Sequence, residues 1–495
     1  MSILGCPQVS VGVPAPKPLL ALAKVRHGQM TQNIYILDMF PYPSGKGLHI
    51  GHCVGYIPTD VVARYHRGLG NQGCHPMGFD SFGLPTEYYA ISQGKTCEEV
   101  TQTNIARFKE QLNMLHLDLD WDREIWTSNP DYYCWTQWIF LQLYNSWFNH
   151  ETCRAEPIET YWGKDPDSVR LVYKAVYEAN WCEELQTTLA DDEVTDGRSN
   201  RGGFPVTRKT IPSWFLRITP YKDRLKEGLE NVEWANKKSQ IKWLKRLHDV
   251  TFSRQRQWGE PIPISGETDT MPSIAGSNWY FFRYLDPKND KEFCSKEAQN
   301  KWLPVDTYVG GSEHNTGHLL YARFITKVLY DLGHSTVDEP FKRIINVGLM
   351  MGEDGQKMAK STGNAVAPDA MVAKYGIDAF RLGICFMGRF EEVKSWNEGS
   401  VKGCEKFLKK LVDLIGRVEE VEIPEQAGLV TAMSIAVGQD IQRFSFNTAV
   451  SKFMTCFNKL KKHDQISRTA MRDYLEALRP FCPHFYSQHR LDRVV

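Results

Sequence analysis

The stretch from Ile34 to Leu69 constrains the fold of this chain more than any other part of the sequence. The run Ile34 to Leu37 is apolar and rich in β-branched and aromatic residues, which favours a buried strand. Prolines and glycines between Pro41 and Gly47 end that strand. Apolar residues then recur at helical spacing from His49 until Gly68. A strand, a tight turn and a helix in this order are the layout of a phosphate-binding site.

Two histidines stand at the start of the predicted helix. His49 and His52 are three residues apart, so both side chains can lie on one face of the helix. Free N–H groups and the positive end of the helix dipole favour an anion there. An exposed histidine pair can also be incidental, and a four-letter motif does not decide between the two interpretations. A second motif, Lys357 to Ser361, adds two lysines about 300 residues downstream.

The composition indicates a globular protein of two or three domains in a reducing, cytoplasmic setting. The chain has 495 residues, too many for one core, and 42% are hydrophobic, as in ordinary globular proteins. Lys plus Arg equals Asp plus Glu at 59 each, so any contact with nucleic acid needs a local basic patch. Twelve cysteines without a CxxC pair argue against disulfides and a zinc knuckle. No apolar run is long enough for a signal peptide or a membrane span.

Asp80 and a second pair of histidines are further candidates. Asp80 lies between Gly78 and Gly83, where an aspartate that caps a turn is the simpler interpretation. His314 and His318 are four residues apart on a predicted helix, HNTGHLLYARFI, and this spacing can hold a metal. The segment lacks the glutamate of an HExxH motif and no third ligand is apparent, so we expect no metal there.

Apolar periodicity predicts further elements. Helices are expected over Gln111 to Leu117 and Tyr132 to Phe148, and a strand over Ile344 to Met350 leads into the lysine loop. Beyond Gly399 the chain turns helical and polar. Three amphipathic segments there predict a helical bundle: CEKFLKKLVDLIGRV, AVGQDIQRFSFNTAVSKFMTCFNKLKKH and TAMRDYLEALRPF.

With these pieces in order, the chain resembles class I aminoacyl-tRNA synthetases, because HIGH (His49 to His52) and KMAKS (Lys357 to Ser361) match the two signatures of that class. Within the class it resembles leucyl-tRNA synthetases from about Ile34 to about Phe485. The most specific matches are DMFPYPSGKGLHIGH, GFDSFGLPTE, TIPSWFLRIT, SRQRQWGEPIPI, KMAKSTGN and KYGIDAFRLG. The resemblance implies an α/β fold, in which a Rossmann-like catalytic domain with a parallel sheet and an insertion is followed by an α-helical bundle.

The resemblance also divides the chain. We expect a loose leader over 1–29, with Met30 as another candidate start, and two halves of the catalytic domain over 30–150 and 253–399. A connective insertion without an editing domain would fill 151–252. A bundle that resembles an anticodon-binding domain would fill 400–495.

Position by position, the resemblance assigns roles to the candidate residues. The catalytic groups at the ATP phosphates match His49, His52, Lys357 and Lys360. Further ATP contacts match Gly51, Gly310, Gly311, Glu313 and Ser361. Asp80 matches the residue that holds the α-ammonium group of the amino acid. The rest of the amino-acid pocket matches Met39, Phe40, Tyr42, Ile274, Ser277, Tyr280, His314 and His318.

Several positions depart from the family pattern. Ile274 stands where an aromatic residue is usual, and Asn315 to Gly317 is more polar than the usual run, so the expected substrate is leucine or a close aliphatic analogue. Ala359 replaces a serine of the lysine loop but leaves both lysines in place. The segment Gly197 to Val206 resembles a branch that has lost its zinc cysteines, which leaves Cys182 alone, so no zinc is expected.

The implied reaction needs alignment and charge neutralisation. The carboxylate of an amino acid is ionised at pH 7, so its attack on the α-phosphorus of ATP requires no general base. Mg²⁺ bridging the phosphates would share the charge, so ATP and Mg²⁺ are the expected cofactors. We expect a monomer.

This chain lacks segments that most leucyl enzymes carry, and their absence leaves open which molecule accepts the aminoacyl group. Only about ten residues separate Lys242 from Ser253, where most leucyl enzymes carry an editing domain. The link from Val347 to Lys357 is also short, and about ten residues follow Phe485.

One hypothesis is a non-editing enzyme that charges tRNA. Its basic patch would comprise Lys402, Lys406, Lys409, Lys410, Lys459, Lys461 and Lys462, which can equally be a solvated helix face. A second is a paralogue that passes the aminoacyl group to a small molecule, peptide or carrier protein. A third is an inactive binding or regulatory module.

Overall fold

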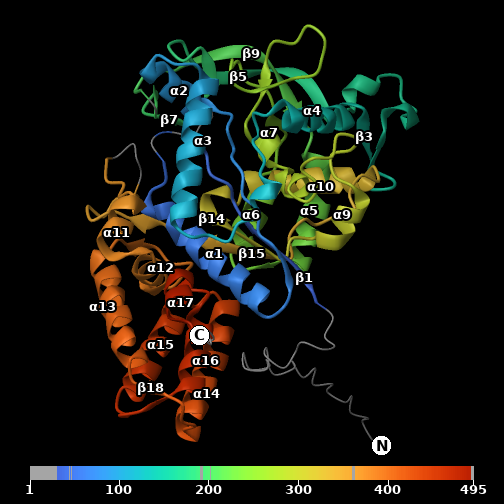
Figure 1. Ribbon diagram of the computed structural model, residues 1–495. Coiled ribbons are helices and arrows are strands. Elements are labelled where there is room, and N and C mark those ends of the chain that lie inside the picture. Colours follow the sequence, from blue (N-terminus) through green and yellow to red (C-terminus); the bar gives the residue numbers. More distant parts are fainter. Residues whose placement is uncertain are drawn as a thin grey trace, which may run out of the picture.

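A five-stranded parallel sheet forms the centre of the protein in this computed structural model, which describes residues 31–43, 45, 47–189, 193–200, 202–358 and 363–491 (Figure 1). The strands are β1 (Asn33–Asp38), β2 (Gln72–Cys74), β10 (Glu233–Trp234), β14 (Thr307–Gly311) and β15 (Arg343–Val347). They lie in the order β10-β15-β14-β1-β2, and every neighbouring pair is parallel. The predicted parallel α/β sheet is confirmed. Because the strand order reverses between β1 and β14, a ligand crevice is expected at their carboxyl ends.

Helices pack around this sheet. α1 (Ile50–Gly68) follows β1 and ends at Gly68, as its apolar spacing predicts. The other helices of the first 397 residues are α2 (Leu84–Gln93), α3 (Cys97–Met114), α4 (Pro130–Tyr144), α5 (Lys222–Gly228), α6 (Lys237–Leu244), α7 (Ile274–Ser277), α8 (Tyr280–Arg283), α9 (Lys296–Trp302), α10 (His318–Asp331), α11 (Pro368–Tyr375) and α12 (Ile377–Phe386).

The helices predicted over Gln111 to Leu117 and over Tyr132 to Phe148 have other bounds in the structure. α3 begins at Cys97, fourteen residues before the predicted start at Gln111, because Thr96 and Glu99 form a capping box there. The helix predicted over Tyr132 to Phe148 ends at Tyr144, since the residues that follow pair as strand β3 (Ser146–Asn149) with β4 (Arg154–Pro157).

The helix predicted to carry both His314 and His318 is shorter than expected. α10 begins only at His318, while His314 ends a 3₁₀ turn, Ser312–His314. Gly317 separates the two with φ −101° and ψ −101°, outside the helical region. The two histidines therefore do not lie one turn apart on a single helix.

An antiparallel sheet covers one end of the molecule, at the top of Figure 1. It consists of β5 (Val172–Cys182), β6 (Thr187–Leu189), β9 (Thr207–Leu216) and β11 (Val250–Thr251), in the order β11-β9-β5-β6. The chain passes from α6 to β11 through residues 245–249 alone. Shorter pairs are β7 (Val194–Thr195) with β8 (Arg198–Ser199), β12 (Glu260–Pro261) with β13 (Thr270–Met271), β16 (Met350–Met351) with β17 (Lys394–Ser395), and β18 (Val418–Glu419) with β19 (Ile466–Ser467).

The C-terminal part is helical, orange to red in Figure 1. It consists of α13 (Glu398–Ile415), α14 (Pro424–Gln442), α15 (Phe446–Leu460), α16 (Arg468–Leu478) and α17 (Pro483–His489). The second of the three predicted segments is two helices, because Phe444 adopts a left-handed conformation with φ 57° and breaks it. Burial of its ring against Phe390 and Phe446 holds this turn.

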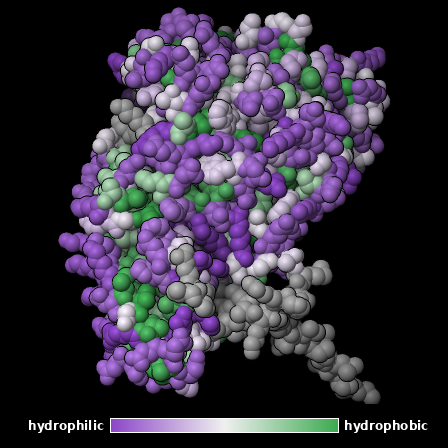
Figure 2. Space-filling model, in the orientation of Figure 1, coloured by the Kyte–Doolittle hydropathy of each residue, from purple (hydrophilic) through white to green (hydrophobic). Residues whose placement is uncertain are grey.

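The face drawn in Figure 2 carries mostly hydrophilic residues, and hydrophobic residues form small groups among them. Within the described part of the chain, no helix is both long and apolar enough to cross a membrane.

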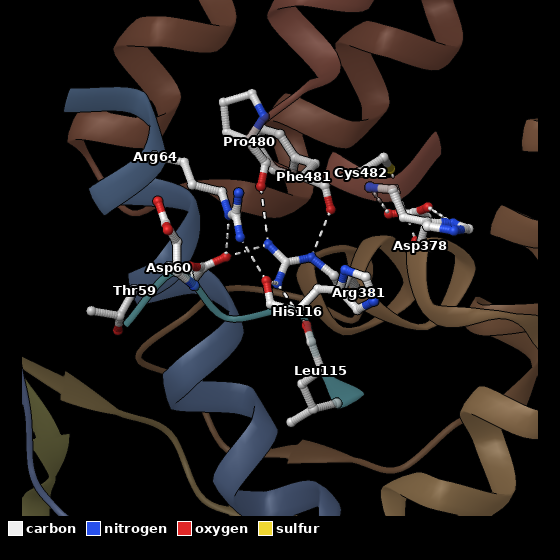
Figure 3. Close-up of polar contacts among 12 residues, drawn as sticks. Thr59, Asp60, Arg64, Leu115, His116, Asp378, Arg381, Pro480, Phe481 and Cys482 are labelled. Atoms are coloured by element: carbon white, nitrogen blue, oxygen red, sulfur yellow. Dashed lines mark hydrogen bonds and ion pairs between the residues drawn. The ribbon is translucent and has the colours of Figure 1, made fainter. Parts of the chain in front are cut away.

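A buried ion pair joins α1 to α12 (Figure 3). Arg381 and Asp60 are both fully buried, and their Nη2 and Oδ2 atoms lie 2.6 Å apart. Arg381 also donates to the carbonyl groups of Leu115, Pro480 and Phe481, each at 3.0 Å. Burial tends to raise the pKa of Asp60, but Arg381 and Arg64 hold that pKa below its usual value. One guanidinium group on α12 therefore connects α1, the end of α3 and the loop before α17.

We expect Asp60→Asn to destabilise the protein by about 3 to 5 kcal/mol, because it leaves the Arg381 cation buried without its counter-charge. Urea unfolding followed by tryptophan fluorescence measures the loss. Glu392→Gln is the matched control, since Glu392 pairs with Arg389 on the surface and its removal should change stability little. Similar small losses for both variants would contradict a structural role for the buried pair.

Candidate active site

Two adjoining cavities lie at the carboxyl ends of β1 and β14, the position that the strand order predicts. The larger has a volume of about 320 Å³ and is bordered by the start of α1 and by the lysine-loop residues Lys357 and Met358. The smaller, of about 160 Å³, reaches toward α7, α8 and α10. Both are lined by Met39, Phe40, Tyr42, Glu313 and His314.

The two histidines of the first motif cap α1. His49 is the N-cap residue, and its Nδ1 accepts a hydrogen bond from Gly51 N at 3.0 Å. His52 Nδ1 accepts from His49 N at 3.2 Å, which completes a capping box. A neutral ring whose Nδ1 accepts carries its hydrogen on Nε2. Both rings line the larger cavity, so the cap fixes the tautomer that can donate to an anion there.

Lys357 brings positive charge to the same cavity. Its Nζ lies 3.4 Å from Oε1 of Glu313, and its side chain is 57% exposed. Burial tends to raise the pKa of Glu313, but its own backbone N–H group and Lys357 bring that pKa below the usual value. Lys360 and Ser361, the other predicted residues of this loop, lie outside the described residues.

Gly310 and Gly311 end β14 where the backbone passes close to other side chains. A Cβ atom on Gly310 would lie 2.1 Å from Sδ of Met39, and one on Gly311 would lie 2.2 Å from Oε2 of Glu313. Neither position can hold a larger residue without displacing a wall of the cavity. Every described residue of the predicted ATP set lines this one cavity, namely His49, Gly51, His52, Gly310, Gly311, Glu313 and Lys357.

Asp80 is a buried acid in the wall of the smaller cavity. Thr127 donates to its Oδ1 at 3.2 Å, whereas Oδ2 has no donor among the described residues. Burial raises the pKa of Asp80 to about 8, against the lowering effect of the Thr127, Ser277 and Tyr42 hydroxyl groups. The turn-capping interpretation is therefore wrong, since this carboxyl group faces the cavity. A cationic ligand would supply the partner that Oδ2 lacks.

Aromatic rings form much of the wall of the smaller cavity. Phe40 stacks on Tyr280 with ring centroids 4.0 Å apart. The hydroxyl groups of Tyr280 and Tyr308 lie 2.5 Å apart, and Tyr308 lies 2.6 Å from Nε2 of His318. Burial lowers the pKa of His318 to about 3, so its ring is neutral. All nine predicted amino-acid residues line this cavity, namely Met39, Phe40, Tyr42, Asp80, Ile274, Ser277, Tyr280, His314 and His318.

Sequence reasoning missed several residues of the site. Tyr308 is the second residue of β14, where the strand pattern indicates only a core residue. Tyr56 stacks near His52 and donates to the carbonyl group of Met39 at 3.2 Å; its position one turn after His52 was an available signal. Thr127 is 47 residues from Asp80, and no local pattern connects them.

Across the described ranges, no group of three or more His, Cys, Asp or Glu side chains is placed to hold a metal ion. Cys182 is buried with Leu189 in a small separate apolar cluster. The predicted absence of zinc stays a prediction.

A third cavity, of about 770 Å³, adjoins the small one past Ile274 and Gly317. It forms a cleft against the antiparallel sheet. Aromatic and basic side chains line it, including Tyr177, Arg208, Trp243, Arg254 and Tyr321.

Comparison with known families and structures agrees with this architecture. The model of "tRNA synthetases class I (M)" matches residues 34–272, and that of "tRNA synthetases class I (I, L, M and V)" matches residues 285–395. The leucine--tRNA ligase of Amoebophilus asiaticus (strain 5a2) is 29% identical, over 91% of this chain and 86% of the relative.

Solved structures share the fold. The Agrobacterium radiobacter K84 agnB2 LeuRS, crystallised as a ternary complex with tRNA and LeuAMS, superposes with a TM-score of 0.80 at 23% identity, over 95% of this chain and 87% of that one. Methionyl-tRNA synthetase of Mycobacterium tuberculosis, in complex with methionyl-adenylate, gives a TM-score of 0.71 at 18% identity, over 92% and 93%. Two family models in chain order, a full-length relative and a common fold agree, and the chain belongs to the class I tRNA synthetases as a homologue of leucine--tRNA ligase.

Proposed function

We propose that this enzyme activates leucine, or a close aliphatic analogue, with ATP to form the aminoacyl-adenylate, and that it transfers the aminoacyl group to tRNA without editing. The observation that carries the proposal is the pair of adjoining cavities. Asp80 lies in the wall of the smaller cavity, while the two histidines that cap α1 and Lys357 line the larger one. A carboxylate that holds an ammonium group and donors that hold phosphates would bring an amino acid and ATP together.

The residues act by positioning and by charge. The ammonium group of the substrate would pair with Asp80, which leaves the substrate carboxylate directed toward the ATP cavity. That carboxylate attacks the α-phosphorus, an O–P bond forms, and the bond to pyrophosphate breaks. The Nε2–H groups of His49 and His52 and the ammonium group of Lys357 would neutralise the negative charge that develops on the phosphates. Mg²⁺ would enter with ATP as part of the substrate.

The short link before β11 supports the non-editing part of the proposal. The chain passes from α6 to β11 through residues 245–249, and these are too few for a folded domain. The leucine--tRNA ligase of A. asiaticus aligns over 798 residues, whereas this whole chain has 495. The relative therefore contains long segments that this chain lacks.

Two surfaces favour tRNA as the acceptor. The cleft beside Ile274 carries aromatic rings and arginines, a combination that binds single-stranded nucleic acid. The seven predicted lysines of the bundle are all exposed. They lie on α13 and at the end of α15. The packing of Phe407 on Phe457 shows that these two helices are neighbours.

A non-tRNA acceptor is the second candidate. The five-residue link favours it, because translation needs more discrimination than one hydrophobic pocket provides, whereas a biosynthetic ligase tolerates errors. ATP–pyrophosphate exchange with a panel of amino acids, with and without tRNA, separates the two functions.

We expect Lys357→Met to lower the kcat of pyrophosphate exchange by about 30- to 1,000-fold, which corresponds to about 2 to 4 kcal/mol of transition-state stabilisation. The KM for the amino acid should stay within about twofold, because Lys357 lies at the other cavity. Lys374→Met is the control, since Lys374 pairs with Glu398 away from both cavities and should leave exchange unchanged. Exchange at the wild-type rate in Lys357→Met would refute the assignment.

The amino-acid KM should fall as the pH rises toward 8. The pKa of Asp80 is about 8 in the free enzyme, so below this pH the group must lose a proton before it can pair with an ammonium group. The KM should fall by up to about tenfold per pH unit between pH 6 and pH 8. Asp80→Asn should raise the KM, abolish this pH dependence and leave the KM for ATP unchanged. A parallel rise in both KM values would indicate a folding defect instead.

Norvaline should be activated and not cleared. A hydrophobic pocket separates substrates that differ by one methylene group by only about 10- to 200-fold. Without a second hydrolytic site, tRNA should not increase AMP formation with norvaline relative to leucine. A tRNA-dependent excess of AMP with norvaline would show that editing takes place in this core. If the enzyme charges tRNA and discriminates poorly between norvaline and leucine, the result supports tRNA as the acceptor. If tRNA affects no step, the result supports a non-tRNA acceptor.

A further inference from the structure

Gln111 connects the two signature motifs, although it belongs to neither. It lies near the end of α3 and is 1% exposed. Its Oε1 accepts a hydrogen bond from the backbone N–H of Leu48 at 2.5 Å, one residue before His49. Its Nε2 donates to Oδ2 of Asp369 at 2.6 Å. Asp369 stands in the first turn of α11, the helix that follows the lysine loop.

The chain before α1 is shaped to receive this side chain. Gly47 has φ +107°, a conformation that suits glycine, and a Cβ atom there would lie 2.3 Å from Oε1 of Gln111. The glycine therefore provides both the turn and the space in which the amide reaches Leu48. This contact fixes the backbone immediately before the histidine cap.

The segment after the lysine loop is tied to the same place. Val366 accepts a hydrogen bond from the backbone N–H of Ile50, the first residue of α1, at 3.0 Å. Asp369 pairs with Arg107 as well as with Gln111. Burial tends to raise the pKa of Asp369, but Gln111 and Arg107 bring it below the usual value, so the group is charged at neutral pH.

The primary amide of Gln111 makes both contacts at once. The oxygen must accept from a backbone N–H while the nitrogen donates to a carboxylate, and neither Glu nor Met offers both functions in this orientation. A buried polar group that has partners on both sides holds two segments at a fixed separation. Here the two segments lead to the histidines on one side and to Lys357 on the other.

We propose that Gln111 is a positioning residue for adenylation, which holds the start of α1 against the segment after the lysine loop so that the two histidines and Lys357 meet the phosphates together. The inference rests on the proposed function, because it concerns the alignment of that reaction. Small displacements of positioned groups lower rates by up to about 100-fold. The loss should therefore appear in the kcat of exchange and in the KM for ATP. The amino-acid KM should change less, because Asp80 and the pocket residues of α7, α8 and α10 lie on other segments.

The test uses the full chain and four variants. Gln111→Met removes both contacts, and Gln111→Glu keeps the acceptor for Leu48 but places a carboxylate against Asp369. Each should lower the kcat of pyrophosphate exchange by about tenfold or more, with the amino-acid KM within about twofold. The double variant Gln111→Glu, Asp369→Asn reverses donor and acceptor and should recover exchange to within about threefold of the wild type. Gln102→Met, an exposed glutamine of the same helix, is the matched control.

Hydrogen–deuterium exchange tests the bridge without relying on activity. In Gln111→Met, peptides that contain Leu48 and peptides that contain Asp369 should both exchange faster than in the wild type. Faster exchange in only one of them, wild-type kcat in Gln111→Met, or equal losses in kcat and amino-acid affinity would overturn the proposal. If none of the amino acids tested supports pyrophosphate exchange by the wild-type enzyme, the proposed function fails. Hydrogen–deuterium exchange would still decide whether Gln111 joins the two segments.

Discussion

The contact between Arg381 and Asp60 fixes the helix on which the candidate site depends. Asp60 lies in the middle of α1, eight residues after His52, and its two oxygens receive Arg64, Arg381 and the backbone N–H of Asp118. Both charges are buried, so either charge without its partner would destabilise the fold. The pair is stable because each group has its counter-charge and its hydrogen bonds. Since Arg381 also binds the loop before α17, the position of α1 depends on the C-terminal helices as well as on the sheet.

A second set of contacts controls the other end of the same helix. Gln111 and Val366 bind the backbone around the N-terminus of α1, where the histidines form their cap. The helix is thus held in its middle by α12 and at its start by α3 and the segment before α11. α12 and the segment before α11 follow the lysine loop in the chain, whereas α3 precedes it. Two motifs about 300 residues apart in sequence consequently meet at one cavity.

Local patterns predicted the parts of this site that depend on neighbouring residues. The strand before Asp38, the start of α1 near His49 and its end at Gly68 all follow from apolar spacing and turn residues. Phe444 and the break before His318 were missed, because long-range burial of Phe444 and the backbone at Gly317 override local helical spacing. The role proposed for Asp80 came from family resemblance, since local sequence favoured a turn cap.

Gln111 shows why the rest could not be predicted. Within its own helix it reads as one polar residue at the end of an amphipathic segment, and its partners lie 63 and 258 residues away. Arg381 is similar, because an arginine among apolar residues of α12 gives no indication of the aspartate that neutralises it. Contacts of this kind depend on the tertiary fold, and only coordinates or co-varying sequences reveal them.

The amino-acid cavity combines a fixed polar end with a more permissive apolar end. Asp80 and the chain from Tyr280 through Tyr308 to His318 are buried and hydrogen-bonded, so they hold one geometry. Ile274 faces the other side, where the cavity adjoins the 770 Å³ cleft. An aliphatic side chain at this boundary excludes less volume than an aromatic ring, so discrimination between neighbouring aliphatic substrates rests on shape alone, with few polar contacts to reject a wrong one. Under the proposed function, the same opening would give an acceptor access to the adenylate, so access for the acceptor and permissiveness toward the amino acid would have a common structural cause.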